Sequence, residues 1–184
     1  MEHHLIIKAR TVAEAAHQGQ VKKSSGASFI THPLAVAGIL TRHRFGPELI
    51  AAGLLHDTVE KTELTHDDIH EMFGEKVAAI VSGCTAHSDT GTWKERKGRH
   101  ISFLKTASRD VKIVACADKL HNLQIIAEEL ERVGDTVWER FAEGRQSREW
   151  YYRTLVECFS SAPNSLKTLA LFREFLVTVQ SLFG

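Results

Sequence analysis

The 184-residue sequence predicts an all-α, single-domain protein. Apolar residues recur three and four positions apart in most segments, which is the period of an amphipathic helix. No segment keeps the strict alternation of a half-buried strand, and the chain shows no repeat, linker or low-complexity tract. With 43% hydrophobic residues, a chain of this length can bury one core without disulfide or metal support. We therefore expect one domain over residues 1–184.

In the first half of the chain, helical periodicity and start signals predict five helices. Pro33 and Pro47 each stand where a helix can begin, because the first turn of a helix needs no proline amide. Thr65-His66-Asp67-Asp68 resembles a capping box, although such boxes prefer Glu or Gln at the fourth position. The expected helices are Leu5–Gln18, Pro33–His43, Pro47–Val59, a segment from Thr65 to Phe73, and Glu75–Ala86, with a polar, basic loop over Gln20–Gly26.

In the second half, the same periodicity predicts three longer helices. They cover Val111–Leu130, Asp135–Phe159 with a bend at Gly144, and about Asn164–Leu182, which follows Pro163. A turn over Ser88–Gly91 and the charged stretch Trp93–Arg99 separate them from the first half.

Composition excludes several classes of function. The chain carries 23 basic and 23 acidic residues, and this balance argues against non-specific nucleic-acid binding, which needs a basic surface. No apolar run approaches the ~20 residues of a membrane span, and no signal peptide is recognisable. The three cysteines, Cys84, Cys116 and Cys158, are far apart and lie in apolar settings. They predict buried free thiols in a cytoplasmic protein, and no sequence feature defines an oligomeric state.

Four polar residues in apolar surroundings are candidate metal ligands. His56 and Asp57 are adjacent on an otherwise apolar helix, His32 stands at a helix start, and Asp118 lies inside the most apolar segment. A buried carboxylate needs a cation, a salt bridge or hydrogen-bond donors, so Asp118 either binds a metal or pairs with Lys119 or an arginine. His32 has the alternative of capping its helix. A mixed imidazole and carboxylate set suits Mn²⁺, Fe²⁺ or Zn²⁺.

The order of these residues and their neighbours resembles the HD-domain phosphohydrolases, and within them the Rel/SpoT-type alarmone hydrolase domain. The matching motifs are Ala16-His17-Gln18-Gly19-Gln20, Phe29-Ile30-Thr31-His32-Pro33, Leu54-Leu55-His56-Asp57-Thr58-Val59-Glu60, Phe73-Gly74-Glu75-Lys76-Val77 and Ala117-Asp118-Lys119-Leu120-His121-Asn122-Leu123. The likeness covers roughly residues 8–160, and no synthetase or regulatory region follows it. The resemblance therefore implies a helical HD-type hydrolase domain acting as a stand-alone small alarmone hydrolase.

The resemblance also implies a mechanism. His32, His56, Asp57 and Asp118 would hold one Mn²⁺, and the family removes pyrophosphate from the ribose 3′ position of nucleotides such as ppGpp. Glu60 matches the first acid of the family's Glu-Asp pair, which orients or deprotonates water. Spacing alone favours a solvated helix-end carboxylate there.

Lys61 replaces the second acid of that pair. The replacement predicts slower hydrolysis, a changed preference in substrate phosphates, or an inactive fold kept for binding. An ion pair between Lys61 and Asp57 is also compatible with the spacing, and an ammonium at this place can stabilise developing phosphate charge.

Four residues are candidate substrate contacts by the same resemblance. Lys22 and Lys23 fall where the family has a basic pair near the nucleobase and phosphates, and lysine stacks on a base less well than arginine. Asn122 matches a residue that contacts the nucleotide sugar, and Lys97 would attract the 5′-phosphates. A solvated loop is the alternative for the first pair, and a solvated charged face is the alternative for Lys97.

Three functions remain open at this point. The first is a Mn²⁺-dependent 3′-pyrophosphohydrolase of (p)ppGpp or (p)ppApp. The second is a hydrolase of another 2′- or 3′-phosphorylated nucleotide, such as NADPH. The third is a nucleotide-binding module in which Lys61 has abolished catalysis. All three imply a nucleotide partner and no nucleic acid or membrane.

Overall fold

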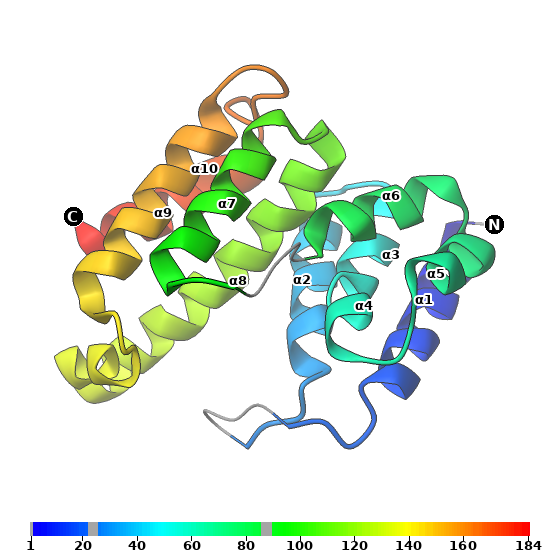
Figure 1. Ribbon diagram of the computed structural model, residues 1–184, viewed down its shortest axis with the longest axis horizontal. Helices are drawn as coiled ribbons and strands as arrows, with labels where there is room; N and C mark the ends of the chain where they lie inside the picture. Colours follow the sequence, from blue (N-terminus) through cyan, green and yellow to red (C-terminus); the bar gives the residue numbers. More distant parts are fainter. Residues whose placement is uncertain (1, 22–25, 86–89) are drawn as a thin grey trace. The chain divides into compact units, whose positions relative to one another are not determined.

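The computed structural model describes residues 2–21, 26–85 and 90–184, and all of its regular elements are helices (Figure 1). Within these ranges the β structure is limited to one isolated bridge between Val21 and Ser28. The elements are α1 (Glu2–Ala16), α2 (Thr31–Arg42), α3 (Pro47–Leu55), α4 (Thr58–Lys61), α5 (His66–Phe73), α6 (Glu75–Cys84), α7 (Trp93–Thr106), α8 (Arg109–Val133), the 3₁₀ helix η1 (Gly134–Arg140), α9 (Gly144–Ser160) and α10 (Ala170–Phe183). The predicted all-α class is confirmed.

The chain forms two compact units that share one helix. The first unit comprises Met1–Thr85 together with Ile113–Ala117, and the second comprises Ala86–Lys112 together with Asp118–Gly184. Helix α8 runs without interruption through both ends of Ile113–Ala117, the part of this helix that belongs to the first unit. The expected single domain over 1–184 remains a prediction.

Helix α3 is the centre of the first unit. It contacts α1, α2 and α6, and its residues from Ile50 to Leu55 are all buried, so this part of the helix has no polar face. Gly53 allows this packing, because a Cβ at this position would lie 2.6 Å from Cδ1 of Leu40 on α2. The close approach of α2 and α3 brings the residues that follow α3 near the start of α2.

The expected helix over Pro47–Val59 is wrong in one respect, because it ends early and a second short helix follows. Helix α3 stops at Leu55, and α4 begins at Thr58. The Thr58 hydroxyl donates to the Leu55 carbonyl at 2.7 Å, and His56 Nδ1 lies 2.9 Å from the Gly53 carbonyl. Side chains thus take up backbone acceptors at the end of α3, and His56 and Asp57 form the junction between the two helices.

The predicted capping box at the start of α5 is confirmed, with aspartate in place of the usual glutamate. The Asp68 amide donates to Oγ1 of Thr65 at 3.2 Å, and the Thr65 amide donates to Oδ2 of Asp68 at 2.8 Å. The Thr65 hydroxyl also donates to Oδ2 of Asp68 at 2.6 Å, and this bond together with the one from the Thr65 amide lowers the pKa of the Asp68 carboxyl group. Helix α5 ends at Phe73 as predicted, because Gly74 adopts a φ of 81°.

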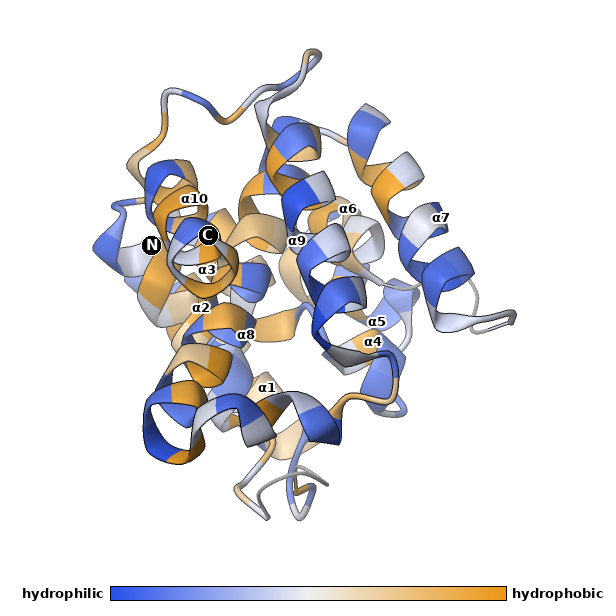
Figure 2. Cartoon of the chain, turned by 90° about the vertical axis from the view of Figure 1, so that its left-hand side faces the viewer, coloured by the Kyte–Doolittle hydropathy of each residue, from blue (hydrophilic) through white to orange (hydrophobic). Residues whose placement is uncertain are grey.

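The second unit is organised by α9, which contacts α7, α10 and η1. Three expectations for this half are corrected. The charged stretch Trp93–Arg99 is helical and belongs to α7, whose polar residues are visible in Figure 2. The expected helix over Asp135–Phe159 is divided into η1 and α9, and Gly144 starts α9 with a φ of 68°. The last helix, expected from about Asn164, begins at Ala170, and residues 164–169 before it are not helical.

The cysteines agree with the sequence prediction, with one exception. Cys84, Cys116 and Cys158 are free thiols, but Cys84 is only partly buried. Among the described residues, the helices are all too short or too polar to span a bilayer.

Candidate functional site

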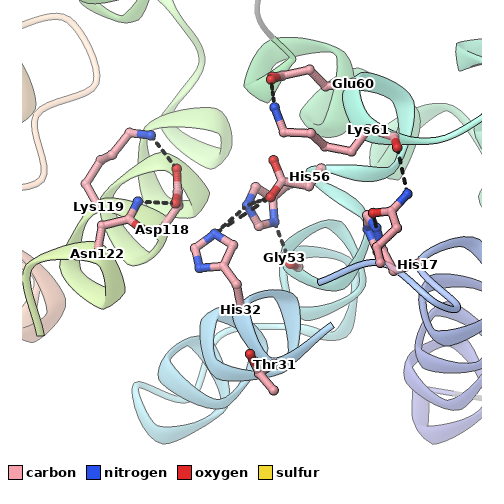
Figure 3. Close-up of polar contacts among 12 residues, drawn as sticks. His17, Thr31, His32, Gly53, His56, Glu60, Lys61, Asp118, Lys119 and Asn122 are labelled. Atoms are coloured by element: carbon pink, nitrogen blue, oxygen red, sulfur yellow. Dashed lines mark hydrogen bonds and ion pairs between the residues drawn. The ribbon is translucent and has the colours of Figure 1, made fainter. Parts of the chain in front are cut away.

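Two buried histidines face each other in the first unit. His32 lies in the first turn of α2 and His56 at the end of α3, and their Nε2 atoms are 3.2 Å apart (Figure 3). Their side chains are 9% and 4% exposed. The start of α2 and the end of α3 therefore bring two imidazoles, 24 residues apart in sequence, to one point.

The backbone determines which nitrogen of His56 is available to a ligand. Nδ1 of His56 lies 2.9 Å from the Gly53 carbonyl oxygen, which can only accept a hydrogen bond. The proton of the neutral ring therefore belongs on Nδ1, and Nε2 carries a lone pair. A histidine that donates one ring N–H to a carbonyl and offers the other nitrogen is the usual arrangement of a metal-binding imidazole.

The carboxylate of Asp57 completes a set of three candidate ligands in this unit. Its Oδ2 lies 3.8 Å from Nε2 of His32 and 3.6 Å from Nε2 of His56. Two ligands that each bind one ion at about 2.1 Å lie roughly 3.0–3.4 Å apart in octahedral or tetrahedral geometry. The distance between the two nitrogens falls in this range and the carboxylate lies slightly outside it, so the donor set fits a divalent cation after a small adjustment.

Glu60 and Lys61 occupy the short helix α4 and interact with each other. The Lys61 ammonium donates to Oε1 of Glu60, and the two side chains are 41% and 29% exposed. The ion pair between Lys61 and Asp57 that the spacing allowed is not the contact that forms. The Glu60 carboxylate, the expected acid, is thus partly neutralised by the residue that replaces the second acid.

Asp118 belongs to the second unit and is held by its own helix. Lys119 Nζ lies 2.6 Å from Oδ2 of Asp118, and Nδ2 of Asn122 donates to Oδ1 at 2.9 Å (Figure 3). The salt bridge that was the alternative to metal binding is therefore present. Burial, the largest single effect, lowers the pKa of Lys119, but Asp118 and smaller contributions outweigh it and hold the pKa well above its usual value. Ala117, the residue before Asp118, is fully buried and belongs to the first unit.

Lys97 lies in a basic and aromatic environment in the second unit. Its ammonium is 5.3 Å from the centroid of the Tyr151 ring. Burial, with the positive charges of Lys119 and Arg148, lowers the pKa of Lys97 to about 8. Burial also raises the pKa of Tyr151. The negative charge of Asp118 opposes the lowering of the Lys97 pKa but does not outweigh it, so the ammonium lies in a net positive environment that suits an anionic ligand.

The structure thus brings five predicted residues together in the first unit and three in the second. His32, His56, Asp57, Glu60 and Lys61 form the first group, and Asp118, Asn122 and Lys97 belong to the second unit. Lys22 and Lys23 lie outside the described residues.

One contact at the site residues and one helix start were missed by sequence reasoning. Gln20 donates through Nε2 to the Lys61 carbonyl at 2.9 Å, a contact between residues 41 positions apart that leaves no sequence signal. A capping box over Thr92 and Glu95, which starts α7, was readable as Thr-x-x-Glu.

Comparison with known proteins identifies a family for the chain. The HD domain family model matches residues 9–146. The chain is 39% identical over 126 residues to a guanosine-3′,5′-bis(diphosphate) 3′-pyrophosphohydrolase of Spiroplasma citri, which is 66% of this chain and 17% of that protein. It is 34% identical over 124 residues to the bifunctional (p)ppGpp synthase/hydrolase SpoT of Escherichia coli K12, which is 65% of this chain and 18% of that protein. The chain thus spans less than a fifth of the length of these relatives.

Two solved structures have the same fold. A crystal structure of lmo0812 from Listeria monocytogenes EGD-e has a TM-score of 0.76 and 37% identity, and the match covers 83% of this chain and 98% of that one. A metazoan ortholog of SpoT that hydrolyses ppGpp has a TM-score of 0.76 at 22% identity, over 97% and 93% of the two chains, and shows the fold alone. With three quarters of its length matched by the family model, the chain belongs to the HD-domain family.

Proposed function

We propose that this HD-domain protein is a metal-dependent 3′-pyrophosphohydrolase of alarmone nucleotides. The observation that carries the proposal is the pair of facing Nε2 atoms of His32 and His56, with Asp57 beside them, in a chain of this family. The relatives named as (p)ppGpp hydrolases, at 34–39% identity, support the same substrate class.

One Mn²⁺ is the proposed ion, held by His32, His56, Asp57 and Asp118. The mixed nitrogen and oxygen donors suit manganese, and Asp118 directly follows the part of α8 that belongs to the first unit. When bound, such an ion polarises a phosphoryl oxygen and lowers the pKa of a bound water. Asn122 orients the Asp118 carboxylate through its 2.9 Å hydrogen bond, as outer partners of metal ligands do.

Glu60 is the proposed proton acceptor. In the reaction, water oxygen bonds to the phosphorus on O3′, the bond between phosphorus and O3′ breaks, and the nucleotide leaves with a 3′-hydroxyl group beside pyrophosphate. The Glu60 carboxylate takes one proton of the attacking water and gives it to the leaving O3′, while the other stays with the pyrophosphate. Because Lys61 holds this carboxylate, we expect hydrolysis to be slower than with two acids at these positions.

Substrate binding is assigned to basic and amide side chains. Lys97 is proposed to bind the 5′-phosphates, since its ammonium is partly buried among other positive charges. Asn122 is proposed to contact the sugar, and Lys22 and Lys23 the base and phosphates. Turnover of ppGpp against ppApp distinguishes guanine from adenine as the base. We propose a cytoplasmic location, because free cysteines are typical of that reducing compartment.

A second candidate function is favoured by the ion pair between Lys61 and Glu60. A chain that keeps the metal ligands but neutralises its proton acceptor can bind a nucleotide without hydrolysing it. Tight binding of ppGpp without turnover, and hydrolysis restored in Lys61→Asp, would support this module.

The deciding experiment incubates purified protein with Mn²⁺ and, separately, ppGpp, ppApp and NADPH, and identifies the products. Pyrophosphate and the 5′-nucleotide from ppGpp or ppApp are expected. If only NADPH is hydrolysed, with release of inorganic phosphate, the substrate is another phosphorylated nucleotide and not an alarmone. Absence of turnover with metal bound would refute the hydrolase.

A further inference from the structure

Hydrogen bonds through the side chains of His17 and Gln20, which the proposed reaction does not use, connect the end of α4 to the segment that follows α1. Oε1 of Gln20 lies 2.9 Å from Nδ1 of His17, and Nε2 of Gln20 donates to the Lys61 carbonyl at 2.9 Å (Figure 3). Both bonds lie within the first unit. A single glutamine therefore connects a buried histidine to the helix that carries Glu60.

The direction of each hydrogen bond follows from the acceptors. The Lys61 carbonyl can only accept, so the amide nitrogen of Gln20 must face it and the amide oxygen must face His17. Nδ1 of His17 then has to be the donor. The opposite orientation of the amide would place two oxygens together, and this geometry allows one arrangement only.

His17 is a fixed anchor for this chain of bonds. It is 1% exposed, and its ring lies 4.7 Å from that of Phe29 at 37°. Among the described residues, Nε2 of His17 has no hydrogen-bond partner, so Nδ1 makes the polar contact of the ring with Gln20. Buried polar atoms are normally hydrogen-bonded, so the bond between Nδ1 and Gln20 is the contact that compensates for burying the His17 ring.

The same residues hold the start of α2. The Phe29 amide donates to the Gln20 carbonyl at 2.9 Å, and the His32 amide donates to the Phe29 carbonyl at 3.1 Å. Gln20 thus contacts, through its backbone, the segment that leads into His32 and, through its side chain, the helix of Glu60.

Helix α4 needs such support because it is very short. It has four residues, and the carbonyls of a single turn have few amides of their own helix to accept from. Lys61 is its last residue, and Thr62 leaves the helix with extended backbone angles. The bond from Gln20 gives the carbonyl of the last helical residue, Lys61, a hydrogen-bond donor.

We propose that Gln20, oriented by His17, is a positioning residue that sets Glu60 relative to His32 by bonding the Lys61 carbonyl. It acts through the backbone of α4 and touches no reacting atom. The inference deepens the proposed function and rests on it for the role of Glu60.

Gln20→Glu tests this role with the least change in shape, because a carboxylate accepts from His17 but does not donate to the Lys61 carbonyl. Gln18→Glu is the matched control, since Gln18 is exposed two residues earlier and the substitution is chemically identical. Amide hydrogen exchange is measured by NMR on wild type and on both variants.

Loss of one hydrogen bond from Gln20 is expected to speed exchange of the Lys61 and Thr62 amides by about fivefold or more. The α3 amides should be unchanged, and Gln18→Glu should match wild type throughout. Equal exchange at Lys61 and Thr62 in Gln20→Glu and wild type would overturn the proposal. This readout does not depend on turnover, so it stays decisive if no alarmone is hydrolysed and the proposed function fails.

Steady-state kinetics separates positioning from general support of the fold. Gln20→Glu should lower kcat for the alarmone by about tenfold and leave KM nearly unchanged, as expected when an acid is displaced from its working position. In a Glu60→Gln background the same substitution should have no further effect, because its target is already removed. Additive losses in the double variant would show that Gln20 does not act through Glu60.

Discussion

Substitution of Lys61 is the sharpest test of the candidate site. Its side chain forms an ion pair with Glu60, and the solvent exposure of both side chains limits the free energy that this ion pair can contribute. The two side chains are 41% and 29% exposed, and ion pairs at such exposure contribute at most about 1 kcal/mol. Since each 1.4 kcal/mol corresponds to about a factor of ten, release of Glu60 from the pair is worth roughly fivefold at most.

Lys61→Ala should therefore raise kcat for ppGpp by no more than about fivefold and lower the free energy of unfolding by less than about 1 kcal/mol. Lys61→Asp adds a second acid as well as removing the pair. Because a positioned acid or base is worth about 10² or more, its kcat should exceed that of Lys61→Ala by at least tenfold. Both are measured as pyrophosphate release under saturating Mn²⁺, beside urea unfolding of each variant.

Lys76→Ala is the control, because Lys76 forms an exposed ion pair with Glu48 at 3.6 Å in the same unit and outside the site. It should leave kcat unchanged at a similar small loss of stability. A fall of more than about tenfold in kcat for Lys61→Ala would refute the reasoning, since the ammonium would then assist phosphoryl transfer directly.

Three further predictions follow from individual side chains. His56→Ala should abolish stabilisation by Mn²⁺, which in wild type reaches about 2.7 kcal/mol at a hundredfold excess over Kd, as read by the metal-dependent shift of Tm. Lys97, whose pKa burial lowers to about 8, is charged below that pH and neutral above it. The kcat/KM for the nucleotide should therefore fall as pH rises through about 8 in wild type, and this step should be absent in Lys97→Met, whose value should be uniformly low. Lys112 is fully buried and donates to the carbonyls of Lys105 at 3.2 Å and Pro163 at 2.8 Å. Lys112→Met should cost about 2–4 kcal/mol in chemical unfolding, against less than about 0.5 for the exposed Lys105→Met.

The parts of the fold that local patterns determine were predictable from the sequence. The capping box at Thr65 and the stop at Gly74 depend on residues within one turn, and both are present as expected. The meeting of His32 and His56 was expected from the order of motifs, and the facing nitrogens agree with it.

Features that depend on distant or competing contacts were not predictable. The break after Leu55 is accompanied by a bond from the Thr58 hydroxyl to the Leu55 carbonyl, and helical periodicity carries no sign of this break. The contact between Gln20 and the Lys61 carbonyl joins two segments whose proximity only the packing of α1 and α3 creates. The helix over Trp93–Thr106 was overlooked because its charged first turns hide the apolar period, although Thr92 and Glu95 mark its start.

The path of the chain through its two units has a consequence for synthesis on the ribosome. The first unit lacks Ile113–Ala117, five buried residues, until the polypeptide has passed through Ala86–Lys112. A nascent chain that stops before residue 113 therefore carries His32 and His56 on an incomplete core. The next residue to emerge after that core is complete is Asp118. The core of the first unit is thus completed one residue before Asp118, the last proposed metal ligand, is synthesised. Truncated chains that end before residue 113 should therefore neither fold stably nor retain metal.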